Sequence, residues 1–291
     1  MHLVTYDRGQ GARVGVLDQT HVIDVASLFP AWPTTMIGLI EKGDAALAEL
    51  KAAMPNAKEK IPAFLVKIMA PIPKPARNII CVGRNYYDHI KEMHGEAAAQ
   101  QKEASEFPVI FTKAPTTVIA TGEEVPGYLD YSNTLDYEGE LAVIIGKEGI
   151  GISKDKAFEH VYGYSIFNDV TARTIQKQHT QWFLGKSIDG FGPFGPAIVT
   201  KDEIADVTKL RVRTELNGEE RQNATVSMMI FDIPTIIYTV SRTQKLLPGD
   251  IIATGTPSGV GQGFKPPRLM KKGDEVVIYI DQLGELRNKI G

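Results

Sequence analysis

The stretch DYEGELAVII, residues 136–145, places two glutamates directly before a continuous apolar run. A short apolar run of this kind is typical of a buried strand. Because side chains alternate between the two faces of a strand, we expect Glu138 and Glu140 on one face, joined by Asp136 if the strand begins early enough. Two ionised carboxylates at the mouth of a core strand are costly to bury, and a divalent cation removes that cost. A strand end that splays both glutamates into solvent is the alternative.

The chain has 291 residues, enough for one large domain or for a large domain with a small companion. Its content of 43% hydrophobic and 23% charged residues is ordinary for a soluble globular protein. A formal net charge of −3 supplies no broad positive field, so we expect neither nucleic acid nor a membrane as a partner. No apolar run is long enough to span a bilayer and no signal-peptide pattern is present, so we expect a cytoplasmic protein.

A proline-rich junction at Pro71, Pro73 and Pro75 disfavours both helix and inner strand. We therefore predict a small N-terminal domain over residues 1–72, with short strands and two short helices, and a larger domain over residues 73–291. The larger part is rich in strand signals, and a helix is predicted over residues 233–241. No strand is predicted in the glycine- and proline-rich residues 190–196. The single cysteine, Cys81, cannot form an internal disulfide and is interpreted as a small core residue.

His89 and Glu92 lie three residues apart where the pattern turns helical, so they are expected to be neighbours on one helix face. A carboxylate beside a histidine can orient it and hold it basic, as a general base requires, whereas a solvated surface pair is the alternative. Residues 95–106 lack anchoring hydrophobic side chains, which predicts either a mobile lid or a surface loop. The glycine cluster at residues 259–263 lacks the spacing of a dinucleotide-binding loop, and is interpreted as a tight turn that brings backbone amides and Thr256 near a site.

Five short motifs occur in a fixed order along the chain. They are Gly83-Arg84-Asn85-Tyr86 with His89 and Glu92, Glu138-Gly139-Glu140, Asp169-Val170-Thr171-Ala172-Arg173, Gly185-Lys186-Ser187, and the run from Thr254 to Gly261. Together they resemble the fumarylacetoacetate hydrolase family over roughly residues 73–291, and in particular its acylpyruvase and 2-hydroxyhepta-2,4-diene-1,7-dioate isomerase-like branch. The resemblance implies an α+β, mostly β fold: a mixed, strongly bent β-sheet roll around a metal site, preceded by a small N-terminal α/β domain. It also implies a homodimer.

The resemblance further implies that Glu138, Glu140 and Asp169 are metal ligands. Three carboxylates without a nearby cysteine or histidine form a hard, oxygen-only site, which suits Mg²⁺ or Mn²⁺, with Ca²⁺ as a further alternative. Asp136 is left outside this set, as a turn residue or a support for the ligands. The implied substrate is a small keto acid that chelates the metal.

In the family pattern, His89 oriented by Glu92 activates water to cleave a C–C bond in an acylpyruvate or related 2,4-diketo acid, and Lys186 stabilises the enolate that departs. Four residues are implied as substrate-binding groups: Arg84, Arg173, Gln176 and Thr256. Two alternatives use the same site without an attacking water, namely decarboxylation of a β-keto acid such as oxaloacetate and isomerisation of a hydroxymuconate-type dienol. A non-catalytic metal-binding protein that keeps the fold is the third.

Overall fold

In the computed structural model, which describes residues 1–103 and 107–291, the apolar run after Glu138 forms strand β11 (Gly139–Ile145). Every residue of β11 is buried, and the strand lies in the middle of a large sheet between β12 (Val161–Asn168) and β17 (Ile251–Ala253). A strand buried on both faces is apolar throughout rather than alternating. The predicted core strand is therefore confirmed.

The large sheet contains twelve strands within the described residues, in the order β4-β3-β2-β1-β14-β12-β11-β17-β6-β7, with β5 paired to β1 and β8 to β14. Its pairings are mixed, since β17 runs parallel to β6 and β14 parallel to β8, while the other pairs are antiparallel. Its remaining strands are β1 (His2–Asp7), β2 (Ala12–Asp18), β3 (His21–Asp24), β4 (Ile61–Pro62), β5 (Lys67–Met69), β6 (Ile79–Gly83), β7 (Val109–Lys113), β8 (Val118–Ile119) and β14 (Gly192–Thr200).

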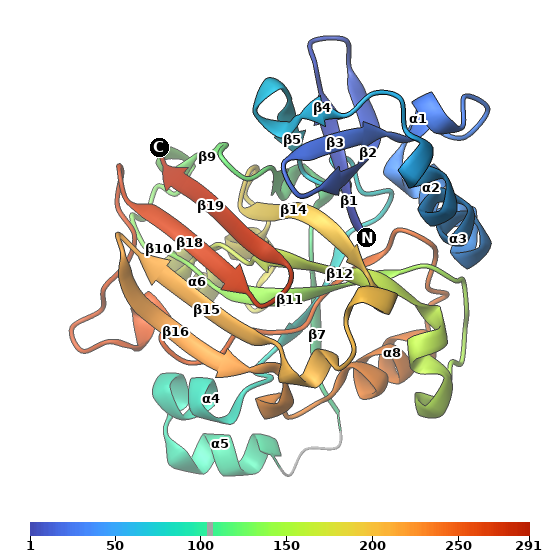
Figure 1. Ribbon diagram of the computed structural model, residues 1–291. Coiled ribbons are helices and arrows are strands. Elements are labelled where there is room, and N and C mark those ends of the chain that lie inside the picture. The colour runs from blue at the N-terminus through green and yellow to red at the C-terminus, as the bar shows by residue number, and fades with distance from the viewer. Residues whose placement is uncertain (104–106) are drawn as a thin grey trace.

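A second sheet lies across the first, in front of β11 and β12 in Figure 1. Leu141 and Val143 of β11 pack with Val212 and Ile278 of this sheet in one apolar core. Ala142 and Ile144 point to the opposite face and join a different core. The second sheet consists of β9 (Glu124–Val125), β15 (Arg211–Leu216), β16 (Glu219–Thr225), β18 (Glu275–Ile280) and β19 (Gly284–Ile290). A separate two-stranded sheet pairs β10 (Leu135–Asp136) with β13 (Thr171–Ala172). The predicted α+β fold of mixed sheets is confirmed.

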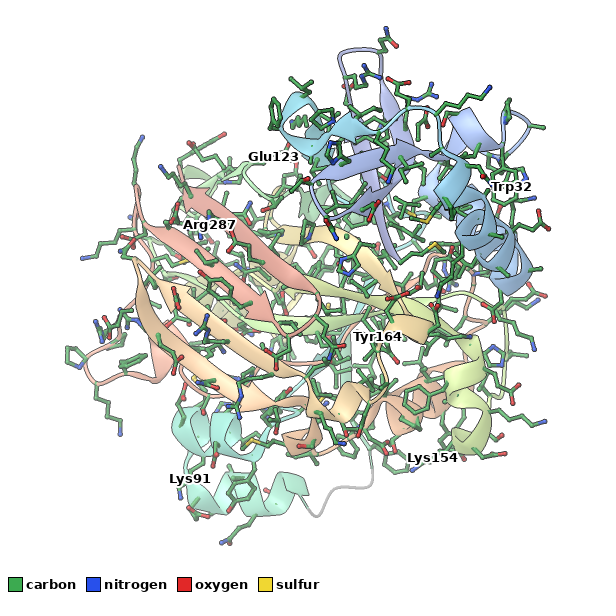
Figure 2. All side chains as sticks on the ribbon, viewed as in Figure 1. Trp32, Lys91, Glu123, Lys154, Tyr164 and Arg287 are labelled. Atoms are coloured by element: carbon green, nitrogen blue, oxygen red, sulfur yellow. The ribbon has the colours of Figure 1, made fainter. Side chains whose placement is uncertain are left out.

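The helices lie around the sheets, and the charged side chains of Lys91 and Lys154 are exposed at the periphery while Tyr164 is buried in the interior (Figure 2). None of the helices in the described ranges is long and apolar enough to cross a bilayer. The homodimer and the cytoplasmic location stay predictions. The helices are α1 (Val25–Leu28), α2 (Met36–Glu41), α3 (Gly43–Ala53), α4 (Tyr87–His94), α5 (Glu96–Glu103), α6 (Arg173–Gln178), α7 (Phe183–Lys186) and α8 (Ile233–Ser241).

The first 72 residues fold as the predicted strands and helices, and Thr35 caps α2 by accepting a hydrogen bond from the Gly38 N–H group at 3.2 Å. Their strands do not form a sheet of their own, because β1 pairs with β14 in the register His2–Val199 and so extends the large sheet. The domain boundary after residue 72 stays a prediction.

Strand β14 occupies the place where no strand was predicted. Glycine and proline disfavour a regular strand interior, but proline is accommodated at an irregularity in the ladder. Such an irregularity is present, because Tyr164 pairs with Val199 whereas Ile166 pairs with Gly195. Between these two pairs β12 advances by two residues whereas β14 advances by four. Pro196 lies in this longer segment of β14.

The segment 95–106 was predicted as a lid or a surface loop. Residues 96–103 instead form helix α5, which lies beside α4 in Figure 1, and Ala99 on it is fully buried. Residues 104–106 lie outside the described residues. Alanine, glutamine and lysine are good helix formers, so the absence of an apolar stripe did not prevent a short helix. A lid role stays a prediction.

Gly139 separates the two glutamates at a point where the two sheets approach each other closely. A Cβ atom there would clash with Thr214 Oγ1 on β15. We expect Gly139→Ala to destabilise the protein by roughly 1–3 kcal/mol through overpacking, measured as a lower midpoint of urea unfolding. Thr214→Ala removes an oxygen that has no hydrogen-bond partner among the described residues, so it should be nearly neutral and should restore most of the loss in the double variant. A double variant as unstable as Gly139→Ala alone would contradict this explanation.

Candidate active site

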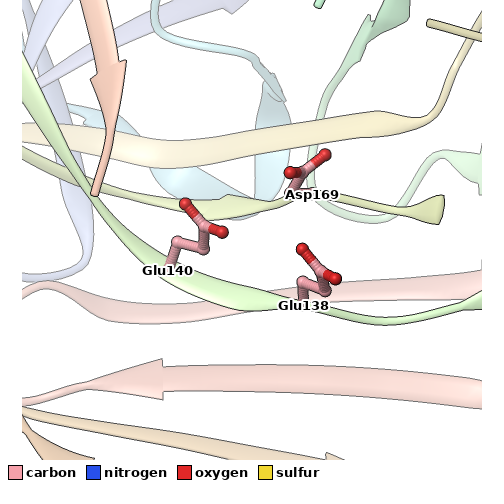
Figure 3. Close-up of side chains that lie close together, drawn as sticks. All are labelled: Glu138, Glu140 and Asp169. Atoms are coloured by element: carbon pink, nitrogen blue, oxygen red, sulfur yellow. The ribbon is translucent and has the colours of Figure 1, made fainter. Parts of the chain in front are cut away.

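Glu138, Glu140 and Asp169 come together at the ends of β11 and β12, with ligand oxygens that all lie within 4.8 Å of one another (Figure 3). All three side chains are buried. Glu140 shares a face of β11 with Ala142, as the strand period predicts, and the Asp169 N–H group donates to the Glu138 carbonyl at 2.9 Å, which fixes the two chain segments to each other. The sequence-predicted trio is therefore one cluster, and the solvent-exposed alternative is wrong.

Three cations contact this cluster. The Lys186 ammonium donates to Glu138 Oε2 at 2.6 Å and to Asp169 Oδ2 at 2.7 Å. Arg173 Nη1 lies 2.6 Å from Glu138 Oε1, and Lys113 Nζ lies 2.7 Å from Asp169 Oδ1. Burial alone would raise the pKa of Glu138, but the charges of Lys186 and Arg173 outweigh it and hold the pKa at about 2. Glu138 is therefore an anion at neutral pH.

Glu140 has a different environment. Its Oε2 accepts a hydrogen bond from the Gly255 N–H group at 2.8 Å, and no cation forms an ion pair with it among the described side chains. Burial and the neighbouring charges of Asp169 and Glu138 raise the pKa of Glu140 well above its usual range. A Glu140 anion is therefore unfavourable here unless a further positive charge lies beside it.

This imbalance fits a divalent cation. The buried carboxylates of the region are Asp136, Glu138, Glu140 and Asp169, and the buried cations facing them are Lys113, Arg173 and Lys186, so one carboxylate is left without a counter-charge. An uncompensated buried charge costs several kcal/mol, whereas a hard cation prefers carboxylate oxygens. Glu138, Glu140 and Asp169 are the residues that can hold such an ion.

His89 is buried on α4 and lines the same pocket as Glu138 and Glu140. Its Nδ1 has no hydrogen-bond partner among the described residues, and burial lowers the pKa of His89 to about 4. The predicted contact with Glu92 is not formed within the described part of the chain, because Glu92 Oε2 accepts from the Gly259 N–H group at 2.6 Å. Burial raises the pKa of Glu92 to about 7. With a pKa of about 4, His89 is thus uncharged at neutral pH.

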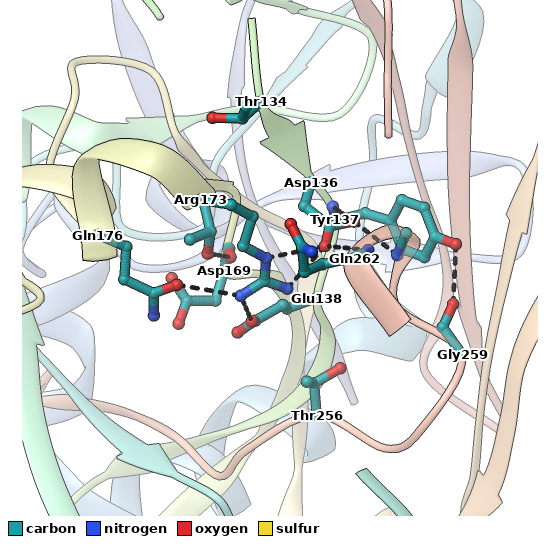
Figure 4. A network of polar contacts seen from close by, with 12 residues as sticks. Thr134, Asp136, Tyr137, Glu138, Asp169, Arg173, Gln176, Thr256, Gly259 and Gln262 are labelled. Atoms are coloured by element: carbon teal, nitrogen blue, oxygen red, sulfur yellow. Dashed lines mark hydrogen bonds and ion pairs between the residues drawn. The ribbon is translucent and has the colours of Figure 1, made fainter. Parts of the chain in front are cut away.

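Asp136 is neither a turn residue nor a solvent-facing one. It is fully buried, and its Oδ2 accepts from Arg173 Nε at 2.8 Å and from the Gln262 N–H group at 3.0 Å (Figure 4). Its Oδ1 accepts from the N–H groups of Gly261 at 2.7 Å and Tyr137 at 3.0 Å. Asp136 therefore joins the glycine-rich loop to the guanidinium that also contacts Glu138.

The residues implied as substrate-binding groups all line the pocket, but they differ in how free they are. Thr256 Oγ1 donates to the Gly139 carbonyl at 3.0 Å and accepts from Gln222 Nε2 at 2.7 Å, so its hydroxyl is already engaged. Gln176 accepts from Arg173 Nη1 at 3.3 Å. Arg84 is exposed and forms no ion pair with any described side chain, so it is the one most available to a ligand.

The sequence did not point to Lys113, and it did not name the partners of Asp136, for which support of the ligands was one of the two predicted roles. Lys113 is fully buried at the end of β7, where its ammonium also donates to the Val170 carbonyl at 3.0 Å. The signal available was a lysine ending the otherwise apolar strand Val109–Lys113. A charged residue is almost never fully buried without a partner, so its burial requires the neighbouring carboxylate.

Comparison with known proteins identifies the family. The model of the fumarylacetoacetate (FAA) hydrolase C-terminal region matches residues 78–291. The chain therefore belongs to the fumarylacetoacetate hydrolase family. Among its relatives, oxaloacetate tautomerase YisK of Bacillus subtilis (strain 168) is 48% identical over 269 residues, which covers 89% of this chain and 87% of that protein.

Solved structures agree over the whole chain. A fumarylacetoacetate hydrolase from Exiguobacterium antarcticum superimposes with a TM-score of 0.85 at 40% identity, covering 100% of this chain and 99% of that one. The maleylpyruvate hydrolase of Sphingobium sp. SYK-6, in complex with a manganese(II) ion and pyruvate, gives a TM-score of 0.81 at 31% identity, covering 100% and 98%. The family model, the relative and the solved structures thus agree on the family, and the solved structures also agree on the fold.

Proposed function

We propose that this protein is a metal-dependent enzyme that interconverts the enol and keto forms of oxaloacetate. One observation carries the choice among the reactions considered: His89 lines the pocket as an uncharged base, and Glu92 binds Gly259 instead of His89. An uncharged imidazole can accept a proton from a carbon acid, which is the step that tautomerisation requires. The 48% identity to an oxaloacetate tautomerase supports the same conclusion.

Mg²⁺ or Mn²⁺ would be held by Glu138, Glu140 and Asp169, in agreement with the charge imbalance of the cluster. When bound, such an ion polarises the carbonyl group next to the carbon that loses the proton. The pocket itself measures about 240 Å³. This is below the range of about 300–1,000 Å³ typical of sites for drug-sized ligands, so it favours a compact substrate.

The side chains of the pocket supply the two parts of the reaction. In the keto-to-enol direction His89 takes a proton from C3, and the electron pair of that C–H bond becomes the C2–C3 double bond of an enolate. The oxygen at C2 then takes up a proton to give the enol, and the reverse direction returns a proton to C3. Lys186 and Arg173, both cations buried beside the pocket, stabilise negative charge at the enolate.

Two other reactions pass through a related enolate, that of pyruvate. Decarboxylation of oxaloacetate releases CO₂ without an attacking water. Hydrolysis of an acylpyruvate-type 2,4-diketo acid is the second candidate, and the 31% identity to a maleylpyruvate hydrolase favours it. Three assays on the Mn²⁺-loaded enzyme separate them: the rate at which the ultraviolet absorbance of enol-oxaloacetate decays, the release of CO₂, and the release of pyruvate from acetylpyruvate. Fast enol decay without the other two supports the proposal, and pyruvate release without enol decay overturns it.

Replacing His89 with glutamine should reduce kcat for tautomerisation roughly 100- to 10,000-fold, the usual contribution of a general base. Mn²⁺ affinity, measured by calorimetry, should stay unchanged because the imidazole is not among the metal-binding groups. Asp88→Asn, at an exposed position on the same helix that does not line the pocket, serves as the matched control and should keep full activity. Full activity in His89→Gln would refute the assignment of the base.

A further inference from the structure

The pocket has two chemically different ends. The acidic residues that line it, Glu138 and Glu140, are buried at the inner end. The exposed titratable side chains that line it are all basic or imidazole groups, namely Arg84, His94, Lys177 and His179. Neither Arg84 nor Lys177 forms an ion pair with any side chain that the structure describes. The exposed end of the pocket, which we call its mouth, therefore carries two cations, Arg84 and Lys177, that no described side chain pairs.

The rings of Phe111 and Trp182 form an aromatic wall of the pocket that links the buried Lys186 ammonium to Arg84. The Lys186 ammonium lies 5.2 Å from the ring centre of Phe111, and Phe111 meets the ring of Trp182 edge-on at a centroid distance of 5.2 Å. The guanidinium of Arg84 lies 5.6 Å from the Trp182 ring. Gly83 makes this arrangement possible, because a Cβ atom there would clash with Trp182. Arg84 is therefore held over the wall of the pocket by a cation–π contact rather than free in solvent.

Helix α6 supplies the second outer cation. Arg173 and Lys177 are four residues apart on this helix and thus lie on one face, with Arg173 buried against Glu138 and Lys177 exposed. Burial and the positive charges of Arg84 and Lys177 lower the pKa of His94. Arg84, Lys177 and His94 all line the same pocket. The two cations thus reach the pocket from two different elements, Arg84 directly after β6 and Lys177 on α6.

We infer that Arg84 and Lys177 form a subsite for a second carboxylate, so that the pocket selects keto acids that carry a negative charge at the end remote from the 2-oxo acid group. This inference rests on the proposed function and narrows it, because oxaloacetate is the short member of that class and acetylpyruvate is not in it. Carboxylate recognition by arginine is charge-assisted and directional, and a rim charge acts mainly on capture of the ligand and on its salt dependence.

The test compares oxaloacetate with its 4-methyl ester, which keeps the 2-oxo acid group but lacks the remote charge. For the wild-type enzyme we expect a KM about tenfold lower for oxaloacetate than for the ester, and a KM for oxaloacetate that rises with ionic strength. In the double variant Arg84→Gln/Lys177→Gln the two KM values should become similar and the salt dependence should flatten, with kcat nearly unchanged. Lys91→Gln, an exposed lysine of α4 that does not line the pocket, is the control.

Binding without turnover keeps this inference separate from the proposed reaction. Calorimetry on the Mn²⁺-loaded protein compares 3,3-difluoro-oxaloacetate, which cannot enolise, with oxamate, which lacks the remote carboxylate. If the wild type turns over no oxaloacetate yet prefers the dicarboxylate, and the double variant loses that preference, the proposed function fails and the subsite stands. If oxaloacetate is turned over and the double variant keeps both the wild-type KM ratio and the wild-type binding preference, the subsite is overturned and the proposed function stands.

Discussion

Glu140→Gln is expected to abolish tight Mn²⁺ binding while making the metal-free protein more stable. The buried Glu140 carboxylate has no cationic partner, and burial together with Asp169 and Glu138 raises its pKa, so its charge is destabilising until a cation arrives. Glutamine keeps the shape and its carbonyl oxygen can still accept from the Gly255 N–H group. It removes only the charge, and with it one of the ligands of the trio.

We expect the loss of Mn²⁺ affinity to exceed about a hundredfold, because even residues that merely support a ligand are worth 10- to 100-fold. Calorimetric titration measures the affinity, and thermal unfolding in the presence of a chelator measures the stability. Glu92→Gln is the matched control: it neutralises a carboxylate that binds the Gly259 amide outside the trio, so Mn²⁺ affinity should persist. Wild-type Mn²⁺ affinity in Glu140→Gln, or a lower unfolding temperature without metal, would show that the cluster does not need a cation.

The placement of the trio could be predicted because it depends on local patterns. An apolar run fixes strand β11, the two-residue period puts Glu138 and Glu140 on one face, and Asp169 directly follows β12. Family resemblance added which strand ends meet, which no spacing in the sequence reveals. The same resemblance gave the mixed-sheet fold, and the structure agrees.

The contact between His89 and Glu92 shows the limit of a local argument. Spacing of three residues on α4 makes them neighbours, but it does not decide which partner Glu92 chooses. The N–H group of Gly259 must find an acceptor where the glycine-rich loop packs on α4, and the Glu92 carboxylate provides one. That loop is 167 residues away in the chain, so the competition is invisible in the sequence around the helix.

The partners of Asp136 and the burial of Lys113 were beyond prediction for the same reason. The partners of Asp136 lie 37 residues away in Arg173 and 125 residues away in Gly261, and those of Lys113 lie more than 50 residues away. Strand β14 was missed because its glycine and proline residues oppose a regular strand, and pairing with β1, β8 and β12 holds it in place. Long-range pairing overrides local preference in each case.

Asp136→Asn is expected to destabilise the protein by roughly 3–5 kcal/mol, the cost of removing one member of a buried ion pair. Every contact that the Asp136 carboxylate makes is with a donor: Arg173 and Gln262 at Oδ2, Tyr137 and Gly261 at Oδ1. An amide has only one accepting oxygen. In either orientation its NH₂ group would face N–H groups, leaving at least two donors without an acceptor.

Urea unfolding measures this loss, and Asp130→Asn is the matched control. Asp130 is a buried aspartate that accepts from the N–H groups of Ser132 and Thr134 but forms no ion pair within the described residues, so its replacement should cost distinctly less. Adding Arg173→Gln to Asp136→Asn should cost less than Arg173→Gln alone, since the contact between the two side chains is already lost. Activity should fall in Asp136→Asn and in the double variant, because Arg173 also holds Glu138 Oε1 at 2.6 Å. If Asp136→Asn and Asp130→Asn are equally stable and the Arg173 change adds its full cost, then Asp136 does not hold the guanidinium in place.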